Sequence, residues 1–254
     1  MALPENSPKV PFSQYARKTF ADAGKALLLQ DDIYPPYLEK EKPFRSGCGM
    51  LALLLLPAGI ALGIGVALNL LTLPRIDLLQ QQFFTLFTQS NFYQSLASQY
   101  QNFGAFFSFI YSLSWLTVRL SGAYPFPASI IFTPLSFITG ILFTWWLFAI
   151  LIQMVTGWLG GKTKKGAMYG PMVFAFAPQL LYIFGVFPGL TVPVTLTAAW
   201  TMAITYQIIR SVYGFSWVRT IMAILITLVV HLVLIFLAVV FGVIIGVMVS
   251  SAMV

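Results

Sequence analysis

The stretch that decides the fold class of this chain is TIMAILITLVVHLVLIFLAVVFGVIIGVMVSSA, residues 220–252. It contains one ionisable side chain, that of His231. A helix that crosses a lipid bilayer needs about 20 mostly apolar residues, and this stretch exceeds that length. A surface helix of a soluble protein would instead show one apolar and one polar face. The stretch therefore predicts a transmembrane helix.

Four further apolar runs have comparable length. They lie at about residues 48–73, 130–158, 168–187 and 190–209. The composition agrees, since 59% of the residues are hydrophobic and only 8% are charged. We therefore expect an all-α, polytopic membrane helix bundle with five transmembrane helices in residues 47–254, preceded by an N-terminal segment, residues 1–46.

Few residues are suited to catalysis or metal binding. Cys48 and His231 are the only cysteine and histidine, so one chain cannot assemble a zinc, iron–sulfur or bis-histidine haem site. No Asp or Glu follows Asp77, whereas proton-coupled transporters usually work through intramembrane acids. We therefore expect a protein that is not an enzyme, has no cofactor and binds no metal. The lack of acidic residues after Asp77 also argues against an ion-coupled carrier.

The net charge of +7 arises mainly at the ends of the apolar runs. Acidic and basic residues nearly balance within residues 1–46. Basic side chains beside span ends meet anionic lipid headgroups. We therefore expect membrane lipids as partners and no nucleic acid.

The basic residues also predict an orientation, because they concentrate on the cytoplasmic side of membrane helices. With five spans, one side receives Lys40, Lys42, Arg45, Lys162, Lys164, Lys165, Arg210 and Arg219. The other side keeps Arg75 and Arg119. This distribution predicts a cytoplasmic N-terminus and an outside C-terminus, and we expect a prokaryotic cytoplasmic membrane.

The outside segment, residues 74–128, allows two arrangements. Its first half places apolar and aromatic residues at helical spacing between glutamines, which predicts an amphipathic helix at the membrane face. The apolar stretch 104–120 is short and rich in serine. It is either interfacial or a sixth span. We expect the interfacial arrangement, because a sixth span would place the lysines of residues 160–166 outside.

The N-terminal segment carries a short amphipathic helix. Ser13 is placed to cap a helix that begins after Pro11. One apolar face would consist of Ala16, Phe20, Ala23 and Leu27. The simpler interpretation is a helix that rests on lipid headgroups, and the alternative is a docking site for a soluble partner.

Pairs of glycines four residues apart suggest close helix packing. Such pairs let two backbones approach each other in a bilayer. The candidates are Gly59 with Gly63 in the first span and Gly242 with Gly246 in the last. They favour a compact bundle that packs against other integral membrane proteins or against a second copy of itself.

Two residues inside the predicted spans are unusual for a membrane helix. His231 is a functional candidate because it is ionisable, but without an acidic partner we expect it to form a hydrogen bond to a neighbouring helix. Pro178 should bend the third span, because proline removes a helix hydrogen bond.

Two short motifs and the span pattern resemble the Yip domain family of five-span membrane proteins. The family often carries Asp-Leu-Tyr-Gly-Pro before its first span, and Asp32-Ile33-Tyr34-Pro35-Pro36 is similar, with proline in place of the glycine. The family also shows a tyrosine and then a proline around its third span, after a glycine-bearing loop. Gly160-Gly161, Tyr169 and Ala177-Pro178 are similar to that stretch.

The resemblance, to a bacterial-type member, implies a non-catalytic scaffold or trafficking role. The family takes its name from interaction with Ypt/Rab GTPases. The candidate site residues that the resemblance implies are Asp32, Tyr34, Pro36, Tyr169 and Pro178. The outside segment of this chain is longer than the family's.

Two other functions fit the sequence. The first is an accessory structural subunit of a larger respiratory or photosynthetic complex, because such subunits have no chemistry of their own and bury faces of small residues. The second is a channel or facilitator for a small solute. Its polar path would use Gln153, Gln179, Thr201 and Gln207.

Overall fold

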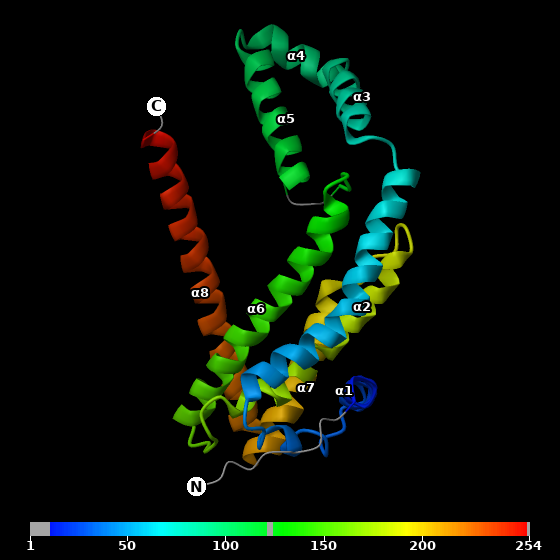
Figure 1. The fold of residues 1–254 in the computed structure, drawn as a ribbon. Coiled ribbons are helices and arrows are strands. Elements are labelled where there is room, and N and C mark those ends of the chain that lie inside the picture. Colours follow the sequence, from blue (N-terminus) through cyan, green and yellow to red (C-terminus); the bar gives the residue numbers. More distant parts are fainter. Residues whose placement is uncertain (1–10, 121–123, 253–254) are drawn as a thin grey trace. The chain divides into compact units, whose positions relative to one another are not determined.

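The computed structural model describes residues 11–120 and 124–252, with side-chain surroundings up to Phe241 except at residues 119, 120 and 239. The helices are α1 (Phe12–Leu27), η1 (Pro35–Tyr37), α2 (Pro43–Thr72), α3 (Ile76–Thr88), α4 (Asn91–Gln99), α5 (Phe103–Leu120), α6 (Ser129–Trp158), η2 (Ala167–Tyr169), η3 (Pro171–Val186), α7 (Val194–Tyr213) and α8 (Trp217–Ala252) (Figure 1). The three η elements are 3₁₀ helices. No strand occurs among the described residues, so the expected all-α class is confirmed.

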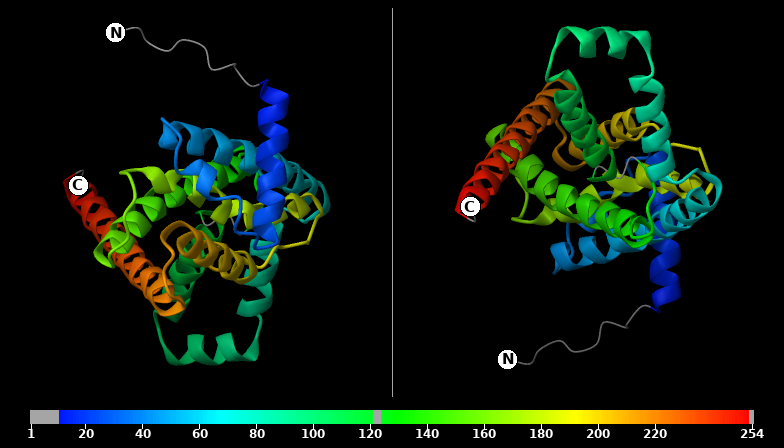
Figure 2. Two further views of the ribbon diagram at one scale, coloured as in Figure 1. Left: turned by 90° about the horizontal axis from the view of Figure 1, so that it is seen from below. Right: turned by 90° about the horizontal axis from the view of Figure 1, so that it is seen from above.

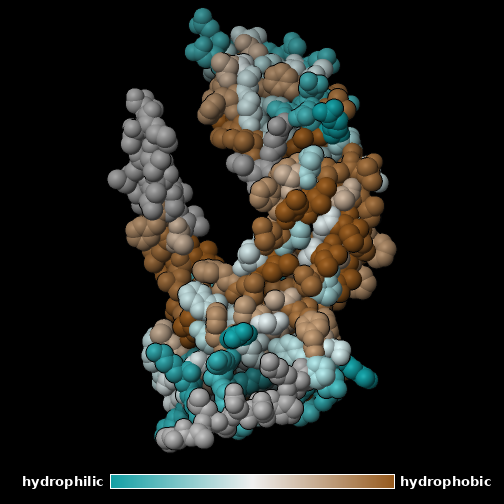
Figure 3. Space-filling view, viewed as in Figure 1, coloured by the Kyte–Doolittle hydropathy of each residue, from teal (hydrophilic) through white to brown (hydrophobic). Residues whose placement is uncertain are grey.

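Four helical segments are long and apolar enough to cross a membrane. They are Pro43–Thr72, Ser129–Trp158, Ala167–Val186 and Trp217–Ala238. Apolar side chains cover the visible flanks of α2 and of the lower part of α8 (Figure 3). In water such surfaces would be costly, whereas lipid tails accept them. The chain is therefore a multi-pass membrane protein.

The run expected to span at residues 190–209 forms α7, a helix of 20 residues that begins at Val194. It is not among the four most apolar segments. The threonines of α7, together with Gln207 and Arg210, make this helix more polar than those four segments. Pro193 stands immediately before its first residue, where a missing N–H costs no helix hydrogen bond.

The third predicted span is a 3₁₀ helix, not a bent α-helix. Residues Pro171–Val186 keep 3₁₀ geometry for 16 residues, with Pro178 inside. At about 2.0 Å per residue, this run extends roughly 32 Å, which matches a hydrocarbon core of about 30 Å. A 3₁₀ helix rises more per residue than an α-helix, so a short stretch is long enough to cross a membrane.

The chain divides into two compact units. The first contains residues 1–57, 138–181 and 192–254, and the second contains residues 58–137 and 182–191. The division passes through α2 directly after Pro57.

In the first unit, α7 and α8 contact each other on either side of a turn at Gly214. The largest fully buried side chains of that unit include Tyr34, Met50, Leu51, Leu54, Leu55, Trp145, Ile152, Met168, Met172, Phe174, Ile204 and Ile208.

In the second unit, α3, α4 and α5 form a helical hairpin in which α4 joins the other two (Figures 1 and 2). The amphipathic first half of residues 74–128 is thus two helices: α3 ends at Thr88, and Ser90 caps α4 by accepting from the Tyr93 N–H at 3.2 Å. Helix α5 runs antiparallel to α3: Phe87 stacks on Phe107 with ring centroids 4.7 Å apart, and the Tyr111 hydroxyl donates to the Gln80 carbonyl. An aromatic core holds this hairpin together.

Candidate functional site

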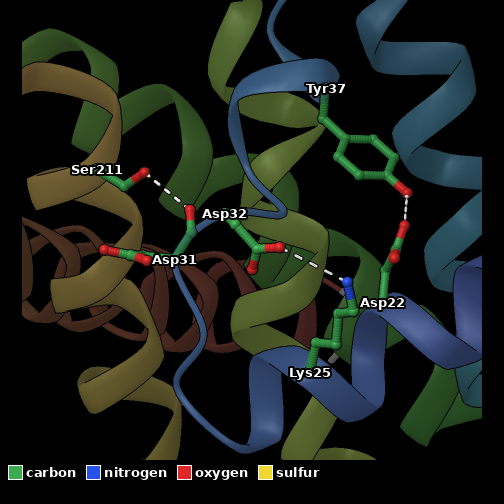
Figure 4. A network of polar contacts seen from close by, with 6 residues as sticks. All are labelled: Asp22, Lys25, Asp31, Asp32, Tyr37 and Ser211. Carbon is green, nitrogen blue, oxygen red and sulfur yellow. Dashed lines mark hydrogen bonds and ion pairs between the residues drawn. The ribbon is translucent and has the colours of Figure 1, made fainter.

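The segment that carries the first family-like motif forms a compact structure, which we call the N-terminal cap (residues 31–40). Pro35 and Pro36 occupy the start of η1, where proline fits because its fixed φ suits the first helical turn. At one end of the cap, the Ser211 hydroxyl of α7 donates to the Asp31 carbonyl at 3.0 Å (Figure 4). Asp32 forms an ion pair with Lys25 of α1 at 3.6 Å. Both charged groups are exposed, so this pair contributes little stability.

Two tyrosines anchor the N-terminal cap in the core of the first unit. Tyr34 is fully buried and Tyr37 is 4% exposed. Both rings contact Phe174 of η3, with centroids 6.5 Å and 4.8 Å away. A Cβ atom at Gly170 would lie 2.6 Å from the Tyr37 carbonyl oxygen, so only glycine permits this approach. The structure thus brings the segment of the first motif onto the segment of the second.

Burial controls the ionisation of both tyrosines. Loss of water contact raises the pKa of Tyr37 above its ordinary value, and the nearby Asp22 carboxylate raises it further. Burial likewise raises the pKa of Tyr34, with a smaller contribution from Asp31. The Tyr37 phenol therefore stays protonated and donates to Asp22 of α1 (Figure 4). The Tyr34 hydroxyl is buried and has no hydrogen-bond partner among the described residues.

Lys40 closes the N-terminal cap against α2. Its ammonium lies 4.6 Å from the centroid of the Tyr37 ring, within the range of a cation–π interaction. The same ammonium donates to the Ser46 hydroxyl at 2.8 Å. Burial lowers the pKa of Lys40, and the neighbouring Lys18 lowers it further. Sequence reasoning missed this residue, since one lysine among several near a span end carries no distinguishing pattern.

Tyr169 and Pro178 have packing roles. The Tyr169 carbonyl accepts from the Trp145 indole N–H at 3.2 Å. The Tyr169 ring packs between Trp145 and Phe44, with centroids 5.5 Å and 5.2 Å away. Pro178 is buried within η3. Tyr169 thus links η2 to α2 and α6 in the first unit.

The predicted glycine pairs differ in whether another backbone segment is seen to approach them closely. Gly59 is buried, and a Cβ atom at Gly63 would lie 3.2 Å from the Ile130 carbonyl oxygen, a tight approach. Among the described glycines, Gly65 leaves the least space for a Cβ atom, which would overlap the Gly185 carbonyl group. Sequence reasoning missed this pair, because its two members lie in different helices. The surroundings of Gly242 and Gly246 lie outside the described residues.

His231 does not form the expected hydrogen bond through Nδ1. This atom is buried and has no partner in the part of the chain that the structure describes. The imidazole ring instead packs edge-on against Phe148, with centroids 6.1 Å apart. This ring contact joins α8 to α6 within the first unit.

The N-terminal cap is an anchored structural element. Its polar groups bond to α1, α2 and α7, and they fix α1 within the first unit. Among the described residues there is no group of three or more His, Cys, Asp and Glu side chains that could hold a metal ion.

No family model, curated protein or solved structure matches this chain.

Proposed function

We propose that this protein is a non-catalytic integral membrane scaffold, similar to Yip domain proteins, which binds other proteins through α1. One observation carries the proposal: the buried side chains of Tyr34 and Tyr37 anchor the N-terminal cap in the first unit, and the cap fixes α1 to that unit. The cap contributes the Tyr37–Asp22 hydrogen bond and the Lys25–Asp32 ion pair to this attachment. A helix fixed in this way is preorganised for binding, which lowers the entropic cost of association.

Exposed apolar side chains near the two ends of α1 offer contact points for a partner. The helix begins at Phe12 with no side-chain cap, so the expected role of Ser13 is wrong. The helix buries Thr19, Ala23 and Ala26 instead of the whole apolar face that the sequence predicts. Exposed large apolar side chains are Phe12 at 73% and Phe20 at 38%, both in α1, and Leu28 at 75%, directly after the helix. Such side chains, presented by a fixed helix, suit a partner protein with an apolar groove.

The proposed orientation places α1, the N-terminal cap and the loop at residues 160–166 in the cytoplasm of a prokaryotic cell. The basic residues near the span ends support this arrangement. In the same orientation the hairpin of α3, α4 and α5 lies outside. A scaffold so placed would bind its partners on the cytoplasmic side.

Affinity purification in mild detergent tests the binding surface. We expect the wild type to retain a defined partner protein or a second copy, and the Phe12→Ser/Leu28→Ser variant to retain at least about ten-fold less. Two large apolar side chains contribute about 1.5–3 kcal/mol each when buried, and about 1.4 kcal/mol corresponds to ten-fold in affinity. Recovery of the wild type as a lone monomer, or equal recovery of the same proteins by both forms, would contradict the proposal.

A second candidate function is an accessory subunit of a larger membrane complex, and the exposed apolar residues of the hairpin favour it. Phe92 is 64% exposed, Phe106 63% and Phe109 65%. These side chains would cover a neighbouring subunit. The Phe92→Ser/Phe109→Ser variant is therefore both the matched control for the α1 variant and the test of this alternative. The scaffold proposal expects it to keep its partner, whereas an accessory subunit would lose its complex.

A further inference from the structure

A pocket of about 590 Å³ lies in the first unit where α6 ends. One wall is apolar and comes from α6, including Ile150, Met154 and Gly157. The other wall comes from the following loop and η2, and it includes Thr163, Lys165 and Tyr169. The pocket thus joins an apolar surface to a basic one.

Hydrogen bonds hold the basic wall in a defined conformation. The side chain of Gln153 donates to the Lys164 carbonyl at 2.6 Å and accepts from the Gly166 N–H at 2.8 Å. Gly166 has a φ of 79°, which favours glycine. Thr163 and Tyr213 of α7 share a hydrogen bond of 3.1 Å. Gln153 therefore fixes the loop to α6.

The charge of this loop is entirely positive. Lys162, Lys164 and Lys165 are exposed, and no carboxylate side chain occurs after Asp77. The pocket also lies at the level where a membrane helix meets water, because Trp158, 67% exposed, is the last residue of α6. Tryptophan is enriched at this level of the bilayer. The pocket therefore faces the headgroup region of the lipids.

We propose that the pocket binds the phosphate group of an anionic glycerophospholipid. Lys165 contacts the phosphate, Lys162 and Lys164 add positive charge, and Ile150 and Met154 contact the upper part of an acyl chain. Basic pockets at the ends of membrane helices select such headgroups. This inference depends on the membrane location of α6, and it is independent of the scaffold function.

Native mass spectrometry of the detergent-purified protein tests the site with phosphatidylglycerol and phosphatidylcholine as probes. We expect the wild type to retain phosphatidylglycerol about ten-fold better than phosphatidylcholine. Gly157→Leu should remove this preference, because its side chain would occupy the pocket, while a Cβ atom there meets nothing within 4 Å. Gly140→Leu is the matched control, since Gly140 is also free of neighbours within 4 Å and does not line the pocket. Equal retention of both lipids by the wild type, or unchanged retention by Gly157→Leu, would overturn the proposal.

Charge variants separate the site from general attraction to lipid. Lys165→Gln should lower phosphatidylglycerol retention about five-fold, since one basic residue near an anionic surface contributes about 1 kcal/mol. Lys42→Gln removes an exposed lysine directly before α2. Because Lys42 does not line the pocket, this change should leave phosphatidylglycerol retention within roughly two-fold of the wild type. Inorganic phosphate alone serves as the third probe. If it binds as tightly as phosphatidylglycerol, the site recognises free phosphate and the lipid assignment is wrong.

Discussion

Gly65→Ala should lower the free energy of unfolding by about 2 kcal/mol. The added methyl group would overlap the Gly185 carbonyl oxygen and lie 2.9 Å from its carbonyl carbon. Backbone atoms cannot move aside as the end of a flexible side chain can, so α2 and the end of η3 must separate. Overpacking of this kind costs about 1–3 kcal/mol or more, which exceeds the gain of about 1 kcal/mol that alanine brings to a helix. Thermal unfolding in detergent, followed by circular dichroism, measures the change.

Gly140→Ala is the control for this substitution. Gly140 lies in α6 and a Cβ atom there meets nothing within 4 Å. The same chemical change should therefore leave the melting temperature unchanged or raise it slightly, through the helix propensity of alanine. If Gly65→Ala and Gly140→Ala melt at the same temperature, the close contact between Gly65 and Gly185 does not stabilise the protein.

Tyr34→Ala should release the N-terminal cap from the first unit. The Tyr34 ring is fully buried and contacts Phe174. Removing a large buried side chain costs about 3–5 kcal/mol, because the lost contacts leave a cavity. We expect limited proteolysis to cut this variant within residues 28–42 at least ten-fold faster than the wild type, since opening of the segment limits cleavage.

Tyr34→Phe distinguishes the ring from its hydroxyl. The hydroxyl is buried and has no hydrogen-bond partner among the described residues. A buried polar group without a hydrogen-bond partner lowers the free energy of unfolding by about 1–3 kcal/mol. The phenylalanine variant should therefore resist proteolysis at least as well as the wild type. Cleavage as fast as in Tyr34→Ala would show that the hydroxyl, and not the ring, holds the cap in place.

The long apolar helices could be predicted from the sequence because the bilayer sets their length. The run predicted at 130–158 is observed as Ser129–Trp158, and the run predicted at 220–252 lies within Trp217–Ala252. The 3₁₀ geometry of Pro171–Val186 could not be predicted in this way. Hydropathy reports how apolar a segment is and gives no information on how tightly its backbone winds.

The site could be predicted only where its residues lie close together in the sequence. The motif at residues 32–36 draws attention to Tyr34. Its partner Phe174, and Gly170, which the Tyr37 backbone approaches, come from a segment far along the chain. The exposure of Phe20 has a similar cause, because the first unit packs against the small residues of α1 instead of its largest apolar side chain. Tertiary packing decides which face of an amphipathic helix is buried.

The most direct test of the account is the accessibility of two introduced cysteines in a Cys48→Ser background, because the proposed scaffold requires the N-terminal cap and the loop at residues 160–166 to face the cytoplasm. Lys164 and Gln94 are both exposed, so either position accepts a thiol without disturbing the core. In intact cells, a membrane-impermeant thiol reagent should label Gln94→Cys and should label Lys164→Cys only after the membrane is permeabilised. Labelling of Lys164→Cys in intact cells would contradict the proposed orientation and the cytoplasmic scaffold function that depends on it.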